Sequence, residues 1–200
     1  MTKKYRNLAR LLEKYRLVLA SGSPRRVHLL KEAGIDFRQI IPDIWEDDSR
    51  HEDPYELATF LAVEKSRAVR EKLAEDEVAL GCDTIVVLGK RILGKPVSEK
   101  EAFEMLSELS GRMHTVCSAV ALLSRTGEAV SGYELSDVYF RNVSASDIRQ
   151  YIKTGEPLDK AGSYGIQERG VFLVDRVVGN IDNVIGLPRT LLNSLAGRMA

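Results

Sequence analysis

One junction constrains the fold of this chain most: an apolar run passes through a small polar turn into an amphipathic stretch. Serine favours the N-cap of a helix and proline its first position, and Ser23 and Pro24 occur in that order. The sequence therefore predicts a strand over 16–20 and a helix over 23–33. A second predicted strand over 37–41 completes a β-α-β unit.

Two arginines, Arg25 and Arg26, stand in the first turn of that predicted helix. The positive end of the helix dipole lies there, so cations are unfavourable unless an anion binds beside them. Together with Ser21 and Ser23 they form a candidate phosphate cradle with fork-shaped donors. The alternative is an ordinary surface turn, and neither of the usual glycine-rich phosphate motifs occurs in the chain.

The bulk properties indicate a soluble globular protein, with 44% hydrophobic residues, 29% charged residues and a formal net charge of zero. Zero net charge provides no global attraction to nucleic acid or to an anionic membrane. No apolar run is long enough for a membrane span or a signal peptide. We therefore expect a cytoplasmic protein that binds neither nucleic acid nor a membrane. Cys82 and Cys117 lie in apolar runs and are expected to be small buried residues without metal.

Strand and helix patterns alternate along the chain, which predicts the α/β class with a mixed sheet. A basic helix over 4–14 is expected to pack loosely on the rest. The predicted division is an N-terminal helical extension, 1–15, and a single domain, 16–200. The further predicted elements are a helix over 54–74 capped by Asp53, a strand over 78–88 turning at Gly89, a helix from Ser98 to 109, two paired strands within 114–143, a helix over 146–153, a strand over 171–177 and a helix from Pro188.

Asp83 interrupts the apolar strand predicted over 78–88. An unpaired carboxylate is costly there, so Asp83 should be paired, metal-bound, protonated or exposed at a strand end. A solvated bulge is the alternative. Lys65 falls inside the apolar stripe of the helix over 54–74, where it either snorkels to solvent or points toward an anionic group.

Charge is distributed unevenly near the N-terminus. Residues 1–31 carry nine Lys or Arg and one Glu, whereas residues 43–56 carry seven acids and one Arg. A basic segment followed by an acidic segment suits an anion and a cation bound side by side. Glu46, in the acidic segment, can supply oxygen ligands to Mg²⁺, and Asp47 or Asp48 could take the same role. The simpler alternative is that this segment is a solvated loop.

Two further residues are singled out by their neighbours. Lys95 stands between Gly94 and Pro96, which fix the backbone on both sides and could aim the cation, although an exposed lysine in a turn is the simpler explanation. His114 has no second histidine at metal-ligand spacing, which predicts packing or hydrogen bonding.

Taken together, the motifs resemble the Maf family of nucleotide pyrophosphatases. The resemblance covers residues 16–195 and rests on SGSPRR at 21–26, LAVEK at 61–65, CDTIVV at 82–87, LGKP at 93–96, LSGRMH at 109–114, DKAG at 159–162 and YGIQ at 164–167. The YGIQ string and Gly186-Leu187-Pro188 resemble the branch that acts on dTTP and UTP.

This resemblance implies two lobes on an elongated mixed sheet with flanking helices, related to inosine triphosphate pyrophosphatases. It implies hydrolysis of a nucleoside triphosphate to the monophosphate and pyrophosphate with Mg²⁺ or Mn²⁺, and a homodimer as the frequent assembly. By position, the resemblance implies that Asp83 is the catalytic acid/base and a metal contact, with Glu46 assisting. Four residues would bind phosphates: Ser21, Ser23, Arg25 and Arg26. Lys65 and Lys95 would neutralise the phosphate charge, and Gln167 would contact the base.

Two departures from the family pattern stand out. Cys82 replaces a smaller residue, and Glu168 follows Gln167 where glycine is frequent, which bears on base preference. Two alternatives remain: a nucleotide-binding regulator of septum formation without significant turnover, and an enzyme whose nucleotide is a modified purine.

Overall fold

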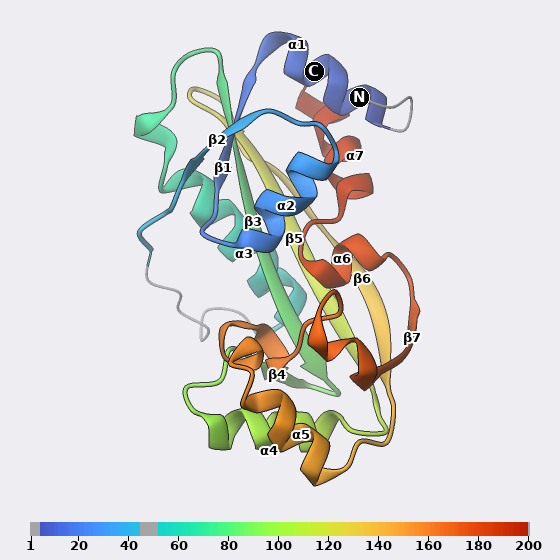
Figure 1. Ribbon diagram of the computed structural model, residues 1–200. Coiled ribbons are helices and arrows are strands. Elements are labelled where there is room, and N and C mark those ends of the chain that lie inside the picture. The colour runs from blue at the N-terminus through green and yellow to red at the C-terminus, as the bar shows by residue number, and fades with distance from the viewer. Residues whose placement is uncertain (1–4, 45–51, 200) are drawn as a thin grey trace. The chain divides into compact units, whose positions relative to one another are not determined.

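The computed structural model describes residues 5–44 and 52–199 (Figure 1). Within these ranges the α-helices are α1 (Arg6–Lys14), α2 (Pro24–Glu32), α3 (Pro54–Arg67), α4 (Glu99–Leu109), α5 (Ala145–Ile152), α6 (Ile181–Ile185) and α7 (Arg189–Met199). The strands are β1 (Arg16–Ala20), β2 (Phe37–Ile40), β3 (Glu77–Leu88), β4 (Arg91–Leu93), β5 (Met113–Ser124), β6 (Val130–Phe140) and β7 (Val174–Val178). Short 3₁₀ segments are η2 (Arg70–Lys72), η3 (Glu156–Asp159), η4 (Ala161–Ser163) and η5 (Arg169–Leu173).

The strands form one mixed sheet in the order β2-β1-β3-β5-β6-β7, with β4 paired to β3. β1 is parallel to both β2 and β3, whereas the β3–β4 and β6–β7 pairs are antiparallel. The predicted β-α-β unit is confirmed as β1, α2 and β2. The predicted hairpin at Gly89 is confirmed as well, and this glycine has the positive φ of 64° that a tight turn favours.

The chain divides into two compact units. Unit 1 contains Met1–Asp83, Ser118–Glu134 and Gly186–Ala200, and unit 2 contains Thr84–Cys117 and Leu135–Ile185. Strands β3, β5 and β6 therefore contribute residues to both units.

One helix of unit 1 is shorter than the sequence predicts. The pattern over 54–74 predicts a single helix, but α3 ends at Arg67 and is followed by η2. Val69 leaves helical geometry (φ −106°, ψ 0°), and both Val69 and Leu73 are buried against strand residues. Tertiary packing therefore overrides the helical stripe at its C-terminal end. Their buried partners are Val18, Ala20, Ala79 and Leu123.

The N-terminal helix is integrated into unit 1, so the expectation of loose packing is wrong. Figure 1 shows α1 beside α7. Leu8 and Leu11 are completely buried. The Asn193 side-chain oxygen on α7 accepts hydrogen bonds from the backbone N–H groups of Asn7 and Leu8, at 3.0 and 3.1 Å. This side chain caps the first turn of α1 from a distant part of the sequence.

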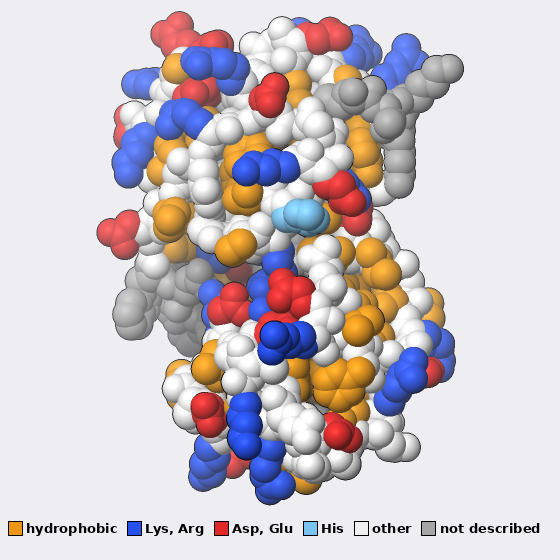
Figure 2. Space-filling model, in the orientation of Figure 1, with side chains coloured by type: hydrophobic (Ala, Val, Ile, Leu, Met, Phe, Trp, Pro, Cys, Tyr) orange, Lys and Arg blue, Asp and Glu red, His pale blue; other side chains and the backbone are white. Residues whose placement is uncertain are grey.

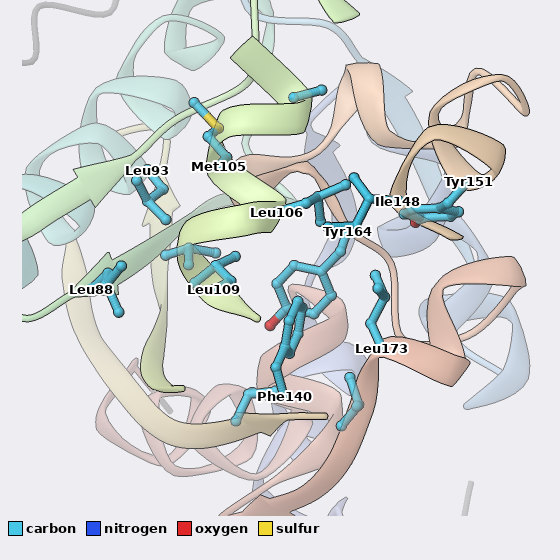
Figure 3. Packing of buried hydrophobic residues seen from close by; sticks show 14 of the residues in the cluster. Leu88, Leu93, Met105, Leu106, Leu109, Phe140, Ile148, Tyr151, Tyr164 and Leu173 are labelled. Carbon is cyan, nitrogen blue, oxygen red and sulfur yellow. The ribbon is translucent and has the colours of Figure 1, made fainter. Parts of the chain in front are cut away.

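The core of unit 2 lies between its strands and helices α4 and α5 (Figure 3). Aromatic residues stand at its centre: the Phe140 and Tyr164 rings are 4.8 Å apart in an edge-to-face arrangement. Aliphatic side chains surround them, among them Leu88, Leu93, Leu106, Leu109, Ile148 and Leu173.

Charged side chains of both signs are interspersed over the face drawn in Figure 2, in keeping with the zero net charge. None of the helices in the described part of the chain is long and apolar enough to cross a membrane.

Candidate active site

The predicted phosphate cradle lies where β1 leads into α2, in unit 1. Ser23 takes the N-cap position with an extended backbone (φ −72°, ψ 119°), as predicted, but its side chain makes no capping hydrogen bond. Ser21 supplies the acceptor instead: its buried Oγ accepts from the Ser23 N–H at 3.2 Å and from Arg26 Nη1 at 2.9 Å. The first turn of α2 contains no acidic residue, which keeps this helix end positive.

The two arginines of the cradle are held differently. Arg26 is only 9% exposed, and its Nε donates to the Gly186 carbonyl at 2.9 Å. It thereby ties the turn to a segment that comes 160 residues later in the chain. Arg25 is half-buried. Arg26 thus fixes the shape of the cradle and also contributes positive charge to it. Phosphate binding by either arginine remains a prediction.

Lys65 and Asp83, the two residues that break apolar patterns, form an ion pair with each other. Lys65 Nζ donates to Asp83 Oδ1 at 2.6 Å, and both side chains are largely buried. Of the alternatives for Asp83, the structure therefore favours pairing, and Lys65 points inward rather than snorkelling. Removing one member of a buried ion pair is costly, because the remaining charge loses its compensating partner.

Gly81 explains how helix α3 comes close enough for this pairing. A Cβ atom on Gly81 would overlap the Ala62 carbonyl oxygen and lie 2.8 Å from the Ser66 N. The backbone of α3 therefore rests directly on β3, with Lys65 in the turn of α3 that makes this contact. Sequence reasoning missed Gly81, although a glycine inside an apolar strand is a recognised signal for close backbone approach.

The β1–β3 register brings the cradle and the ion pair together within unit 1. Ala20 pairs with Gly81 in parallel strands, so Ser21 and Cys82 follow at the same level and Asp83 comes next. The Arg26 and Lys65 charges both act on the Cys82 thiol, but burial dominates and raises its pKa to about 11. Cys82 is therefore a neutral packing residue beside the site, as predicted.

Lys95 and Gln167 belong to unit 2, where a backbone hydrogen bond joins the chain segments that lead to them. The Gly162 N–H donates to the Gly94 carbonyl at 3.0 Å. Gly162 has a φ of 67°, and a Cβ there would lie 3.0 Å from Val86, so glycine is required at this crossing. Lys95 and Gln167 are both exposed. Their contacts with phosphate and base remain predictions.

His114 supports the same part of unit 2 from its core. Its Nε2 and the Tyr164 hydroxyl are 2.7 Å apart and share a hydrogen bond, which confirms the prediction of a packing and hydrogen-bonding role. Burial lowers the pKa of His114 to about 4 and raises the pKa of Tyr164. Both groups are therefore neutral near pH 7.

The predicted metal contacts are Asp83 and Glu46, and Glu46 lies outside the described residues, as do Asp47 and Asp48. Across residues 5–44 and 52–199, no cluster of three or more His, Cys, Asp or Glu side chains is placed to hold a metal ion. Mg²⁺ commonly binds through one or two carboxylates together with substrate phosphates, so a single described carboxylate fits such a site. The metal remains a prediction.

Comparison with known proteins identifies the family. Residues 16–199 match the family described as Maf-like protein. The chain belongs to this Maf-like family. The match begins at the first residue of β1 and extends to the end of α7, so it includes the cradle and the Lys65–Asp83 pair.

Several relatives of this Maf-like protein carry the name dTTP/UTP pyrophosphatase. The relative from Dictyoglomus thermophilum is 40% identical over 188 residues, covering 93% of this chain and 97% of its own. A relative from Bacillus cereus is 43% identical over 173 residues, covering 86% and 90%. The relative from Thermococcus kodakarensis is 45% identical over 172 residues, again covering 86% and 90%.

The fold also has a solved counterpart. The Staphylococcus aureus Ham1 protein superposes with a TM-score of 0.51 at 14% identity, over 92% of this chain and 100% of that chain. This similarity concerns the fold alone. The prediction of an α/β fold with a mixed sheet and flanking helices is confirmed.

Proposed function

We propose that this Maf-like protein hydrolyses pyrimidine nucleoside triphosphates, dTTP and UTP in particular, to the nucleoside monophosphate and pyrophosphate. The observation that carries the proposal is the buried Lys65–Asp83 pair beside the end of β1. Relatives that are 40–45% identical over most of the chain bear the name of this activity.

The chemistry requires a water molecule to attack the α-phosphorus while the bond to the oxygen bridging the α- and β-phosphates breaks. The pyrophosphate leaves with the electrons of that bond, and the attacking water loses a proton. Asp83 is the group that we assign to accept this proton, because a carboxylate held by one oxygen can receive it on the other. Lys65 fixes the carboxylate through Oδ1.

Negative charge on the triphosphate must be balanced while it reacts. We assign Arg25 and the N-terminus of α2 to phosphate binding, with Ser21, Ser23 and Arg26 shaping the turn. Lys95 and Gln167 retain the roles that the family resemblance implies, on phosphate and base. A divalent cation held by Asp83 and Glu46 would supply further charge neutralisation when bound. We also propose that the protein is cytoplasmic and forms a homodimer.

A single substrate panel tests the proposal. Purified protein is incubated with dTTP, UTP, a 5-substituted pyrimidine triphosphate and 7-methyl-GTP, with Mg²⁺, with Mn²⁺ and with chelator, and pyrophosphate and monophosphate are quantified. We expect equimolar pyrophosphate and monophosphate from dTTP and UTP. Nucleotide binding by calorimetry without pyrophosphate release under either metal would overturn the proposal in favour of a nucleotide-binding regulator, and release from 7-methyl-GTP alone would overturn the pyrimidine assignment.

A further inference from the structure

The segment from Gly165 to Gly170 forms a closed loop in unit 2, and Gln167 stands near its middle. The two glycines meet at the neck of the loop: a Cβ on Gly170 would overlap the Gly165 carbonyl oxygen. Gln167, Glu168 and Arg169 are exposed, whereas Gly170 is buried. The loop therefore presents its polar residues outward from a narrow backbone junction.

Two side chains from outside the loop bind this neck. The Tyr151 hydroxyl, at the end of α5, accepts a hydrogen bond from the Gly165 N–H at 3.0 Å and donates to Glu156 Oε1 at 3.0 Å. Glu156 Oε2 in turn accepts from the Arg169 N–H at 3.1 Å. One hydroxyl and one carboxylate thus hold both sides of the neck, before and after Gln167 in the chain.

We call Tyr151 and Glu156 the clamp of this loop. Tyr151 is held in place by the packing of its ring. Tyr151 is 3% exposed, and its ring packs in the core of unit 2 and in an edge-to-face arrangement with Phe172. The hydroxyl cannot move away without disturbing that packing. A Cβ on Gly165 would lie 2.8 Å from Glu156 Oε1, and one on Gly170 would lie 2.6 Å from the Tyr151 hydroxyl. Both glycines are therefore needed for the loop to reach the clamp.

We propose that Tyr151 and Glu156 are positioning residues that fix the Gly165–Gly170 loop and thereby set the base preference of the site. This inference rests on the proposed function, in which Gln167 reads the pyrimidine. Neither residue touches the substrate; each acts through the backbone that carries Gln167. Glu168, which replaces the more usual glycine, is carried by the same fixed backbone.

The test uses Tyr151→Phe and Glu156→Gln in the full chain, with Tyr139→Phe as the matched control. The Tyr139 ring packs against the Arg176 guanidinium, on the β6–β7 strand pair. The first readout is hydrogen exchange at the Gly165 and Arg169 amides. The second is kcat and KM for dTTP and for dGTP. We expect roughly tenfold faster exchange and a roughly five- to tenfold loss of dTTP preference, carried by KM for dTTP rather than by kcat.

Unchanged exchange in both variants would overturn the clamp, and faster exchange with an unchanged dTTP-to-dGTP ratio would overturn its role in base preference. A change in that ratio in Tyr139→Phe would overturn it too. If the wild-type protein releases no pyrophosphate from any triphosphate, the proposed function fails separately. Dissociation constants for dTTP and dGTP then replace the kinetic ratio, and the same comparison decides the positioning claim.

Discussion

The ion pair of Lys65 and Asp83 holds two opposite charges where little water reaches, so each charge compensates the other. Removing one member of a buried pair costs about 3–5 kcal/mol, because the remaining charge is left uncompensated. An exposed pair contributes about 0–1 kcal/mol. The contrast between the two kinds of pair makes this residue-scale assignment testable.

Lys65→Met should lower the free energy of unfolding by about 3 kcal/mol, because it strands the Asp83 carboxylate. The matched control is Lys100→Met, whose ammonium is exposed and lies 3.7 Å from Glu104. Urea unfolding of both variants measures the difference. Equal, small effects of the two substitutions would show that Asp83 finds its solvation elsewhere.

Single residues were predicted unevenly from the sequence. Asp83 and Lys65 each break an apolar pattern and were found for that reason, but their pairing depends on the approach of α3 to β3. Glu77 gave no such signal, because it stands at the start of its strand. It is nevertheless buried, and hydrogen bonds from Arg38 at 2.6 and 2.7 Å lower its pKa to about 2.

At the scale of elements, the contact between α3 and β3 positions the site. Helix starts were predictable from local chemistry: Asp53 caps α3 by accepting from the Tyr55 N–H at 2.7 Å, and Ser98 caps α4. The end of α3 was not predictable, because Val69 and Leu73 continue the helical stripe while packing into the core of unit 1. Caps are local signals, whereas such breaks are decided by tertiary contacts.

Gly81→Ala should separate α3 from β3. The added Cβ would overlap the Ala62 carbonyl oxygen, which is backbone and cannot rotate away. We expect a loss of about 3 kcal/mol in the free energy of unfolding, together with loss of pyrophosphate release. Gly132→Ala, in strand β6, is the matched control, since its Cβ would make only ordinary contacts at 3.5 Å or more. Equal stability of the two variants would contradict the close approach.

At the scale of the whole molecule, acid stability should reflect His114. Its Nδ1 is buried and has no hydrogen-bond partner among the described residues, so protonation would bury an uncompensated charge. The pKa is about 4 in the fold against 6.5 for the free side chain. The neutral form is therefore favoured in the folded state, and stability should fall as the pH drops from about 6.5 to 4, by about 3 kcal/mol.

Urea unfolding between pH 7 and pH 4 measures this slope. Glu77 adds its own loss only at lower pH, between its unfolded value of 4.5 and about 2, because its pKa is lowered in the fold. His114→Gln should remove the loss of stability between pH 6.5 and 4, even if this variant is less stable at every pH. A wild-type stability that is constant from pH 6.5 to 4.5 would contradict the burial of neutral His114.

The class of the whole fold was predictable, because strand and helix patterns alternate clearly. The arrangement around Gln167 was not. Tyr151 and Glu156 have no unusual sequence neighbours, and their importance arises from contacts with Gly165 and Arg169, which only the folded chain brings together. The family resemblance marks Glu168 as a departure from the more frequent glycine, but it does not show how the loop is held.

Pyrophosphate release from dTTP by Asp83→Asn tests whether Asp83 accepts the proton from the attacking water. Asp83→Asn also removes one charge of the buried pair, so turnover is measured per folded molecule. The amide keeps the shape of the side chain but is a far weaker base, so this turnover should fall roughly 10²- to 10⁴-fold while dTTP still binds. Asp36→Asn, an exposed substitution, is the control and should retain wild-type turnover. A folded Asp83→Asn protein that releases pyrophosphate at the wild-type rate would contradict the assignment of Asp83 as the group that accepts the proton from water.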